Sequence, residues 1–132
     1  MKWQNDYNTG ITSIDEQHQE LCNMLNKLEE KMNSDDINQV MGMILKGLVE
    51  YVKFHFQDEE KIMSRIFYPK LEQHKKIHKD LVDQIVKILL DMKNGKEIEA
   101  VELHTFLKRW LRDHILEEDK KIGNHFYRRM SR

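Results

Sequence analysis

The chain has 132 residues, which is the length of one domain built around a single hydrophobic core. Its 22 Lys and Arg residues nearly balance 23 Asp and Glu residues, and a net charge of −1 argues against binding to nucleic acid or to an anionic membrane. One cysteine excludes an internal disulfide and a thiolate-rich metal site. Without a signal peptide or a stretch of ~20 apolar residues, we expect a single cytoplasmic domain over residues 1–132.

A polar arm with scattered apolar residues is predicted over residues 1–12, ahead of the first helix. The letters SIDE, from Ser13 to Glu16, have the form of a capping box and predict that the helix begins there. Its inward stripe follows at spacings of three and four residues: His18, Leu21, Leu25, Leu28 and Met32. The next four residues, 33–36, predict a turn.

A long second helix is predicted after this turn, and a third helix is predicted to carry Pro69 in its first turn. The stripe of the second helix is Ile44, Leu48, Val52, His55, Glu59, Ile62 and Ile66. The stripe of the third helix is Leu71, His74, His78, Leu81, Ile85, Ile88 and Met92. Asn94 and Gly95 predict the end of the third helix, because such a pair suits a helix C-terminus.

A fourth helix is predicted to begin near Glu97, and Gly123 marks a position where we expect a break. Its stripe is Leu103, Leu107, Trp110 and His114. Four helices joined by short connections predict an all-α fold, an up-down-up-down four-helix bundle with an N-terminal arm.

Polar side chains interrupt these inward stripes where an ordinary bundle would have Leu or Ile. They are His18, His55, Glu59, His74, His78 and His114. A single inward histidine is usually a hydrogen-bonded core residue, but a buried carboxylate without a counter-ion costs several kcal/mol. The stripes carry no Lys or Arg, so a bound cation would supply the missing positive charge. Metal sites in bundle cores are built from facing helices in this way.

Asp119 is a further candidate ligand that regular helical geometry would exclude. It follows His114 by five residues, which places the two side chains about 140° apart around an ideal helix. A π-type turn would align them, and such turns are frequent at functional sites. We therefore predict a π turn or a local break in the helix between His114 and Asp119. His104 and His125 lie off the ligand stripes, and we interpret them as surface or packing residues.

Five imidazoles and two carboxylates exceed the four positions of one tetrahedral zinc ion, so two ions are implied. Five nitrogens and four bridging carboxylate oxygens would fill nine of the twelve positions around two octahedral ions. A bridging oxide or hydroxide raises this number to eleven and leaves one position open. Imidazole with carboxylate suits iron, and an open position on a redox metal suits a diatomic ligand.

These motifs resemble the bacteriohemerythrins of the hemerythrin-like family. The resemblance rests on HFQDEE, HKKIH, HILEED and an N-terminal pattern formed by Trp3, Tyr7, Gly10, Ile11, Ile14, Asp15, Gln17 and His18. It implies a non-heme di-iron centre that binds O2 reversibly. By position, one iron would be held by His74, His78 and His114, and the other by His18 and His55. Glu59 and Asp119 would bridge them.

The open position would then fall on the iron held by His18 and His55, where we expect O2, and also NO or azide, to bind. Helical spacing predicts apolar neighbours for it: Leu25, Phe56, Trp110, Leu111 and Ile115. An apolar lining favours binding over turnover, so we expect an oxygen carrier, store or delivery protein rather than an enzyme.

Two other functions remain open. One is a sensor of O2, NO or redox state, although sensors of the family that the chain resembles usually carry an attached signalling domain, for which this chain is too short. A di-iron oxidase or peroxidase would need a proton donor, and Tyr51, one turn before His55, could be one. We expect a monomer.

Overall fold

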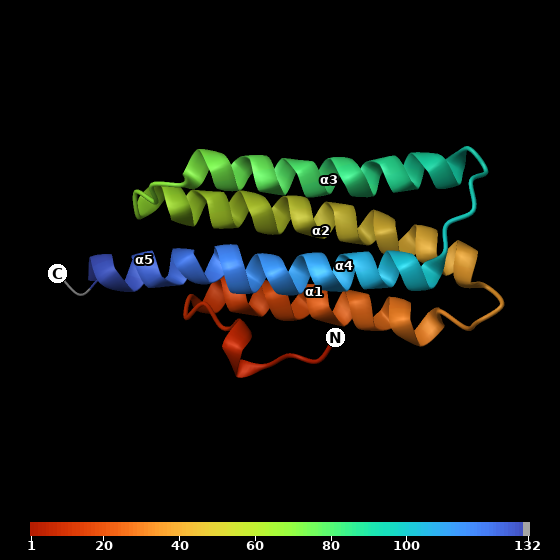
Figure 1. The fold of residues 1–132 in the computed structure, drawn as a ribbon, viewed down its shortest axis with the longest axis horizontal. Helices are drawn as coiled ribbons and strands as arrows, with labels where there is room; N and C mark the ends of the chain where they lie inside the picture. The colour runs from red at the N-terminus through yellow and green to blue at the C-terminus, as the bar shows by residue number, and fades with distance from the viewer. Residues whose placement is uncertain (131–132) are drawn as a thin grey trace.

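The computed structural model describes residues 1–130. Its elements are η1 (Asn5–Tyr7), α1 (Thr12–Lys31), α2 (Ile37–Arg65), α3 (Leu71–Lys93), α4 (Ala100–His114), η2 (Ile115–Asp119) and α5 (Lys120–Met130). The first four α-helices lie side by side in alternating directions, and α5 continues α4 past the end of the bundle (Figure 1). No strand occurs within residues 1–130. The predicted up-down-up-down bundle is confirmed.

The start of α1 is organised by Asp15, and the predicted capping box at Ser13 is wrong. The helix begins at Thr12 without a side-chain cap. Instead, Asp15 Oδ1 accepts hydrogen bonds from the backbone N–H and the hydroxyl of Thr9, at 2.7 and 2.8 Å. Its Oδ2 accepts the N–H of Gly10 at 3.0 Å. Because one carboxylate satisfies three donors of the arm, Asp15 ties the arm to the first turn of the helix.

Two other predicted helix starts are also wrong. α3 begins at Leu71, and Pro69 lies in the preceding turn, which the N–H of Leu71 closes by donating to Tyr68 O at 3.3 Å. α4 begins at Ala100, three residues beyond the predicted start, because Glu99 is still extended with a ψ of 115°. The predicted end of α3 is confirmed, since Gly95 follows it with a φ of +87°.

Gly123 lies inside α5, so the break predicted at this residue is wrong. A Cβ atom placed there would lie 2.0 Å from the carbonyl oxygen of Thr9. Only glycine allows this approach, which lets the arm cross the last helix. The arm therefore packs against the bundle, where Met1 and Tyr7 are buried.

Three layers follow one another along the bundle axis. The first is an apolar cluster built from all four helices, with Leu28, Leu45 and Ile85 fully buried. The second contains five buried histidines and two buried carboxylates: His18, His55, Glu59, His74, His78, His114 and Asp119. The third, the end cluster, consists of Ile11, Ile14, Met63, Tyr68 and Ile122. The polar layer is thus enclosed by apolar residues on both sides along the axis.

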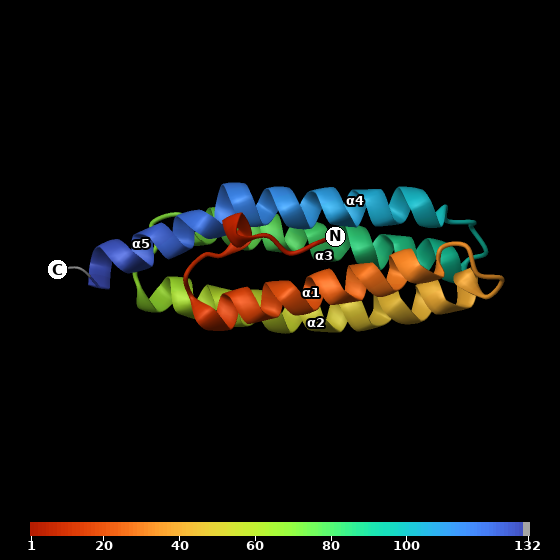
Figure 2. The same ribbon diagram turned by 90° about the horizontal axis from the view of Figure 1, so that it is seen from below.

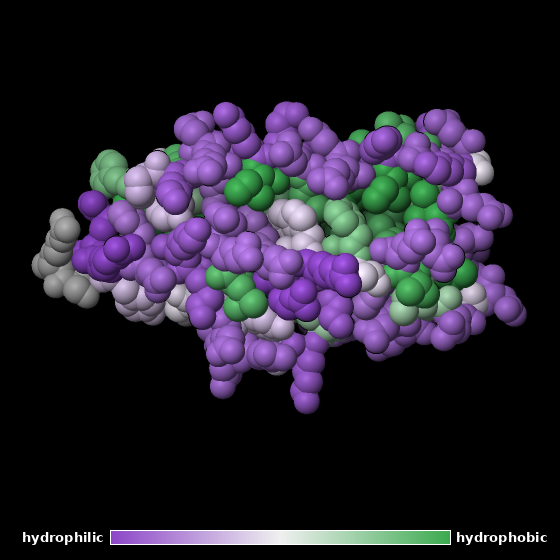
Figure 3. All heavy atoms as spheres, viewed as in Figure 1, coloured by the Kyte–Doolittle hydropathy of each residue, from purple (hydrophilic) through white to green (hydrophobic). Residues whose placement is uncertain are grey.

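The surface is polar over most of the face drawn in Figure 3, and hydrophobic residues gather toward the end opposite the C-terminus. In the part of the chain that the structure describes, no helix combines the length and the apolar character needed to cross a membrane.

Candidate metal centre

Seven buried side chains from α1, α2, α3, α4 and η2 meet in the polar layer, and their exposed fractions lie between 0% and 6%. They form two groups in which the candidate ligand atoms lie within 4.8 Å of one another. The first group is Glu59, His74, His78, His114 and Asp119, and the second is His18, His55, Glu59 and Asp119. All seven residues chosen from the sequence are therefore brought together, and the two carboxylates belong to both groups.

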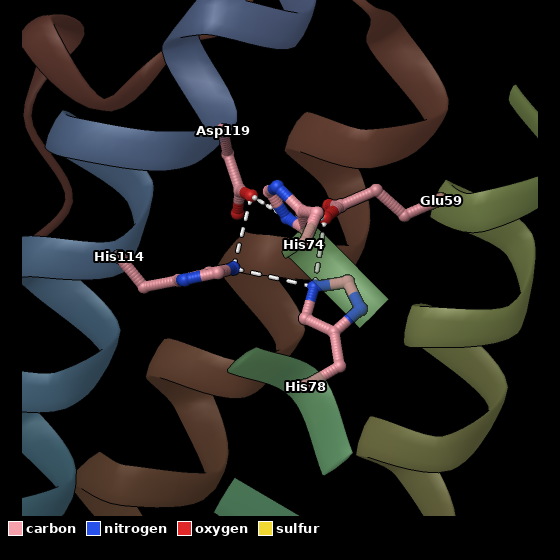
Figure 4. A group of neighbouring side chains, drawn as sticks. All are labelled: Glu59, His74, His78, His114 and Asp119. Atoms are coloured by element: carbon pink, nitrogen blue, oxygen red, sulfur yellow. Dashed lines mark hydrogen bonds and ion pairs between the residues drawn. The ribbon is translucent and has the colours of Figure 1, made fainter. Parts of the chain in front are cut away.

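Regular helical spacing positions four of these side chains. His55 and Glu59 are four residues apart on α2, and His74 and His78 are four residues apart on α3. Residues at this spacing lie one above the other on one face of a helix. Figure 4 shows Glu59 and the α3 pair directed toward the same point as His114 and Asp119.

His114 and Asp119 share a face because η2 is one turn of π-helix, which confirms the turn predicted between them. Asp119 is fully buried, and its Oδ1 lies 3.0 Å from His114 Nε2. Figure 2 shows that the chain changes direction where α5 leaves the line of α4. The π turn therefore brings a carboxylate inward that an unbroken α-helix would direct to the side.

Glu59 directs its two oxygens to different sets of histidines. Its Oε1 lies 3.0 Å from His74 Nε2 and 3.1 Å from His78 Nε2. Its Oε2 lies 3.2 Å from His55 Nε2 and 3.6 Å from His18 Nε2. A carboxylate in this orientation faces both groups at once.

Asp119 divides its oxygens in the same way. Its Oδ1 lies 3.0 Å from His114 Nε2 and 3.1 Å from His74 Nε2, whereas its Oδ2 lies 2.9 Å from His18 Nε2. Both carboxylates thus present one oxygen to a three-histidine set and one to a two-histidine set. Two ions bridged by carboxylates would require this division, as in sites where two metals lie ~3.5–4 Å apart.

The electrostatics of the cluster are dominated by these two carboxylates. Burial alone would lower the pKa of His18, but the nearby carboxylates of Asp119 and Glu59 raise it to about 9. The same competition raises the pKa of His74 to about 10. Burial raises the pKa of each carboxyl, yet the positive charges of the nearby histidines outweigh it and hold both values well below the ordinary range. Without another cation, protons on the histidines must therefore balance the carboxylates.

Several polar atoms of the cluster have no hydrogen-bond partner: His18 Nδ1 and Nε2, His74 Nδ1, Glu59 Oε2 and both oxygens of Asp119. Burying such an atom without a partner costs roughly 1–3 kcal/mol. Among them, His18 Nε2 lies 2.9 Å from Asp119 Oδ2 and 3.6 Å from Glu59 Oε2 without hydrogen-bond geometry, which is the behaviour of ligands that surround a common centre. An imidazole and carboxylate donor set of this kind fits two transition-metal ions.

Two histidines are oriented by outer partners that the sequence analysis missed. His55 Nδ1 donates to Gln17 Oε1 at 2.6 Å, and the amide nitrogen of Gln17 donates to Asp58 Oδ2 at 2.9 Å. His78 Nδ1 donates to Glu60 Oε2 at 2.9 Å. With the proton held on Nδ1, each Nε2 is left as a lone-pair donor toward the cluster.

An apolar cavity of about 20 Å³ lies beside the cluster, between all four long helices. It is lined by Leu21, Leu25, Leu48, Val52, Leu81, Ile85, Leu107, Trp110 and Leu111. Its volume is of the order needed to hold one small molecule, since about 10–15 Å³ suffices for a water. Leu25, Trp110 and Leu111 thus line the cavity, as expected from the sequence. Leu21, Val52 and Leu81 were missed, although each lies three residues from a candidate ligand.

Phe56 and Ile115, which we also expected in the pocket, do not line the cavity. The Phe56 ring stacks on His78 with ring centroids 3.7 Å apart and planes 2° from parallel, and Ile115 is fully buried beside His114. Trp110 stacks on His114 at 4.4 Å and 17°. These rings limit the orientations that the two imidazoles can take.

Tyr51, the proton donor considered from the sequence, does not line the cavity either. Its ring lies 6.0 Å from that of Phe54, which is exposed. Burial, with a contribution from Glu20, raises the pKa of the Tyr51 phenol. No residue that lines the cavity carries a carboxyl, hydroxyl or amino group.

Known proteins share both the sequence pattern and the fold. The family model described as hemerythrin HHE cation binding domain matches residues 9–125. A bacteriohemerythrin from Stenotrophomonas maltophilia is 35% identical over 122 residues, which is 92% of this chain and 78% of that protein. One from Clostridium acetobutylicum is 31% identical over 126 residues, covering 90% and 95%. A crystal structure of wild-type hemerythrin superposes with a TM-score of 0.87 at 28% identity, covering 94% and 95%. The chain therefore belongs to the hemerythrin family.

Proposed function

We propose that the protein holds two iron ions and binds O2 reversibly, as a carrier, store or delivery protein. The observation that carries this proposal is the division of the Glu59 and Asp119 oxygens between two sets of histidines. In this proposal His74, His78 and His114 would hold one iron and His18 and His55 would hold the other, with an oxide or hydroxide as a further ligand. The iron pair would supply redox-active coordination of a diatomic ligand.

The chain's own residues support binding rather than turnover. The cavity beside the cluster is lined only by aliphatic side chains and Trp110, so it disfavours water and presents no acidic side chain to a bound ligand. Charged products of oxygen reduction need solvent or a proton in order to leave. The dry lining would therefore keep bound O2 from being lost as superoxide or peroxide.

The first test is a metal analysis with an optical spectrum, followed by stopped-flow mixing of the reduced protein with O2. We expect about two irons per chain and a stable oxygenated species. A ratio near one, or zinc as the main metal, would contradict the di-iron assignment. Rapid decay to the ferric protein would instead favour an oxidase or peroxidase.

Leu111→Ala tests the cavity separately, because Leu111 lines it one turn before His114. Truncation enlarges the cavity and admits water, so the iron content should stay near two while autoxidation becomes several-fold faster. Leu103→Ala is the matched control, since Leu103 is buried on the same helix without lining the cavity. Equal autoxidation rates in the two variants and the original protein would argue against a protective cavity.

Azide and NO are proposed as further ligands of the two-histidine iron. An azide adduct on the three-histidine iron would contradict this assignment of the open position. The cytoplasmic location and the monomeric state expected from the sequence stay predictions.

A further inference from the structure

The two sets of histidines differ in the charge of their outer hydrogen-bond partners. On the three-histidine side, His78 Nδ1 donates directly to the carboxylate of Glu60 at 2.9 Å. On the two-histidine side, His55 Nδ1 donates to the neutral amide of Gln17 at 2.6 Å, and the carboxylate of Asp58 is one hydrogen bond further away. His18 Nδ1 and His74 Nδ1 have no partner. The outer charge is therefore unequal on the two sides of the cluster.

This difference changes how well each imidazole donates electrons through Nε2. A carboxylate that accepts the Nδ1 proton pulls it away from the ring and makes the ring a more basic ligand. An amide oxygen does so less, because hydrogen bonds to a charged acceptor are roughly twice as strong as those between neutral groups. A more basic ligand stabilises the higher charge of a metal ion.

The surroundings of His78 preserve the effect. Phe56 stacks parallel to the imidazole and limits the orientations that the ring can take beside Glu60. The side chain of Glu60 is 24% exposed, and that of His78 is 2% exposed. The hydrogen bond thus joins a partly buried carboxylate to a buried ring, where electrostatic interactions are screened less than at the surface.

We propose that Glu60, acting through His78, makes the three-histidine metal the preferred holder of the higher charge, whereas Gln17, acting through His55, leaves the two-histidine metal more easily reduced. This inference rests on the proposed di-iron centre. It assigns Glu60 and Gln17 as positioning residues that make the two metals unequal. The affected step is the transfer of one electron from a reductant to one ferric ion, with no bond broken in the protein.

The test measures the equilibrium between oxidised and reduced iron in a mediated titration with dithionite. Glu60→Gln keeps a hydrogen-bond acceptor but removes its charge, so it should shift the oxidised-to-reduced ratio at a fixed potential about tenfold toward reduced iron, within the range of outer-partner effects. Glu50→Gln is the matched control, because it removes one charge from an exposed position of the same helix. This control should leave the ratio unchanged.

The opposite change is made on the two-histidine side, where the amide of Gln17 and the carboxylate of Asp58 are exchanged. In the double variant Gln17→Glu, Asp58→Asn, a carboxylate at position 17 would accept the hydrogen bond from His55 Nδ1. The amide at position 58 would donate to that carboxylate, and the net charge of the protein would stay the same. The ratio should shift about tenfold toward oxidised iron. General damage to the site would move both variants in the same direction, so opposite shifts are the expected signature.

Shifts of the same sign, or unchanged ratios with two irons retained, would overturn the proposal. If Glu60→Gln fails to fold or to retain iron, the double variant decides alone: a shift toward oxidised iron supports the proposal, and no shift overturns it. Mössbauer spectra of the half-reduced protein should show the ferrous ion at the site that binds azide. A protein that loads iron but forms no stable oxygenated species would contradict the proposed function and leave these potential measurements valid.

Discussion

In α2, Leu45, Leu48 and Val52 occupy the same inward stripe as His55 and Glu59, about one to four turns away. The first three residues belong to the apolar cluster, whereas the other two face imidazoles and a second carboxylate. The remaining long helices repeat this change from apolar to polar along one stripe. One bundle therefore contains a half that is stable by burial and a layer that needs charge compensation.

This difference separates the stability of the fold from the binding of metal, two properties that are often lost together. Burial of apolar surface stabilises the fold whether or not a cation is present. The polar layer contributes little to stability until its carboxylates are compensated, because unpaired buried charges are costly. Substitutions in the layer should therefore change the metal content first, and substitutions in the apolar half should change the free energy of unfolding first.

Glu59→Gln should have the largest effect, because Glu59 faces four histidines and a carboxamide cannot bridge two ions. We expect the iron content to fall from about two per chain to one or less, with the helical circular dichroism retained. Elemental analysis measures the loss, and Glu50→Gln at an exposed position is the control. Two irons retained in Glu59→Gln would show that the layer does not depend on this bridge.

Leu45→Ala should produce the converse result. Leu45 is fully buried in the apolar half, and truncating a buried leucine costs about 2–5 kcal/mol. Denaturant unfolding of the metal-loaded protein should show this loss, while the iron content stays near two. If the iron were lost as well, the two regions would not be separable.

The pH dependence of stability should have opposite signs with and without metal. In the metal-free protein, the raised pKa values of His18 (about 9) and His74 (about 10) mean that the folded state binds more protons than the unfolded state above pH ~6.5. The contribution of these two histidines to the free energy of unfolding is fully present below pH ~6.5 and is lost as the pH rises through 9 and 10. Metal binding must displace those protons, so the loaded protein should gain stability over the lower part of this range.

Thermal unfolding at pH 6, 7.5 and 9 would measure both slopes in the metal-free and the loaded protein. Release of protons on adding Fe²⁺ to the metal-free protein provides an independent check. A metal-free protein that becomes more stable between pH 6.5 and 9 would contradict the assigned charge balance.

Phe67→Gly should have the smallest effect and should leave both regions unchanged. Phe67 has a φ of +54° in the turn after α2, where the N–H of Tyr68 donates to Met63 O at 2.9 Å. Glycine adopts this conformation without strain, so we expect a gain of about 1 kcal/mol, reduced by the loss of the contact between the Phe67 ring and Arg129. Denaturant unfolding would detect the gain, and a loss of stability would show that the ring contact outweighs the strain.

The sequence predicts the polar layer well because most of its members follow the helical period. His55 and Glu59 lie on the stripe of α2, so their inward direction follows from the spacing alone. The π turn could also be predicted, because His114 and Asp119 cannot face one centre on an ideal helix. The inward stripe of α2 and the π turn can both be predicted from the period of the α-helix.

Other features depend on contacts that spacing does not determine. Gln17 and Glu60 lie beside the stripes, and their hydrogen bonds to histidines depend on rotamers and on the packing of α1, α2 and α3. The start of α1 was misassigned because Ser13 matches a local motif, whereas Asp15 bonds to an arm whose path is set by the rest of the fold. Helical spacing predicts Phe56 among the neighbours of the open position, but its ring lies against His78 from another helix.

The close approach of Thr9 to Gly123 has a consequence for how the chain folds. The two residues are separated by most of the sequence, so the arm can take its final place only after the last helix has formed. The bonds from Thr9 and Gly10 to Asp15 are local and can form much earlier. The arm should therefore be shaped early at its junction with α1 and docked late against α5, which makes its docking one of the slow, long-range steps of folding.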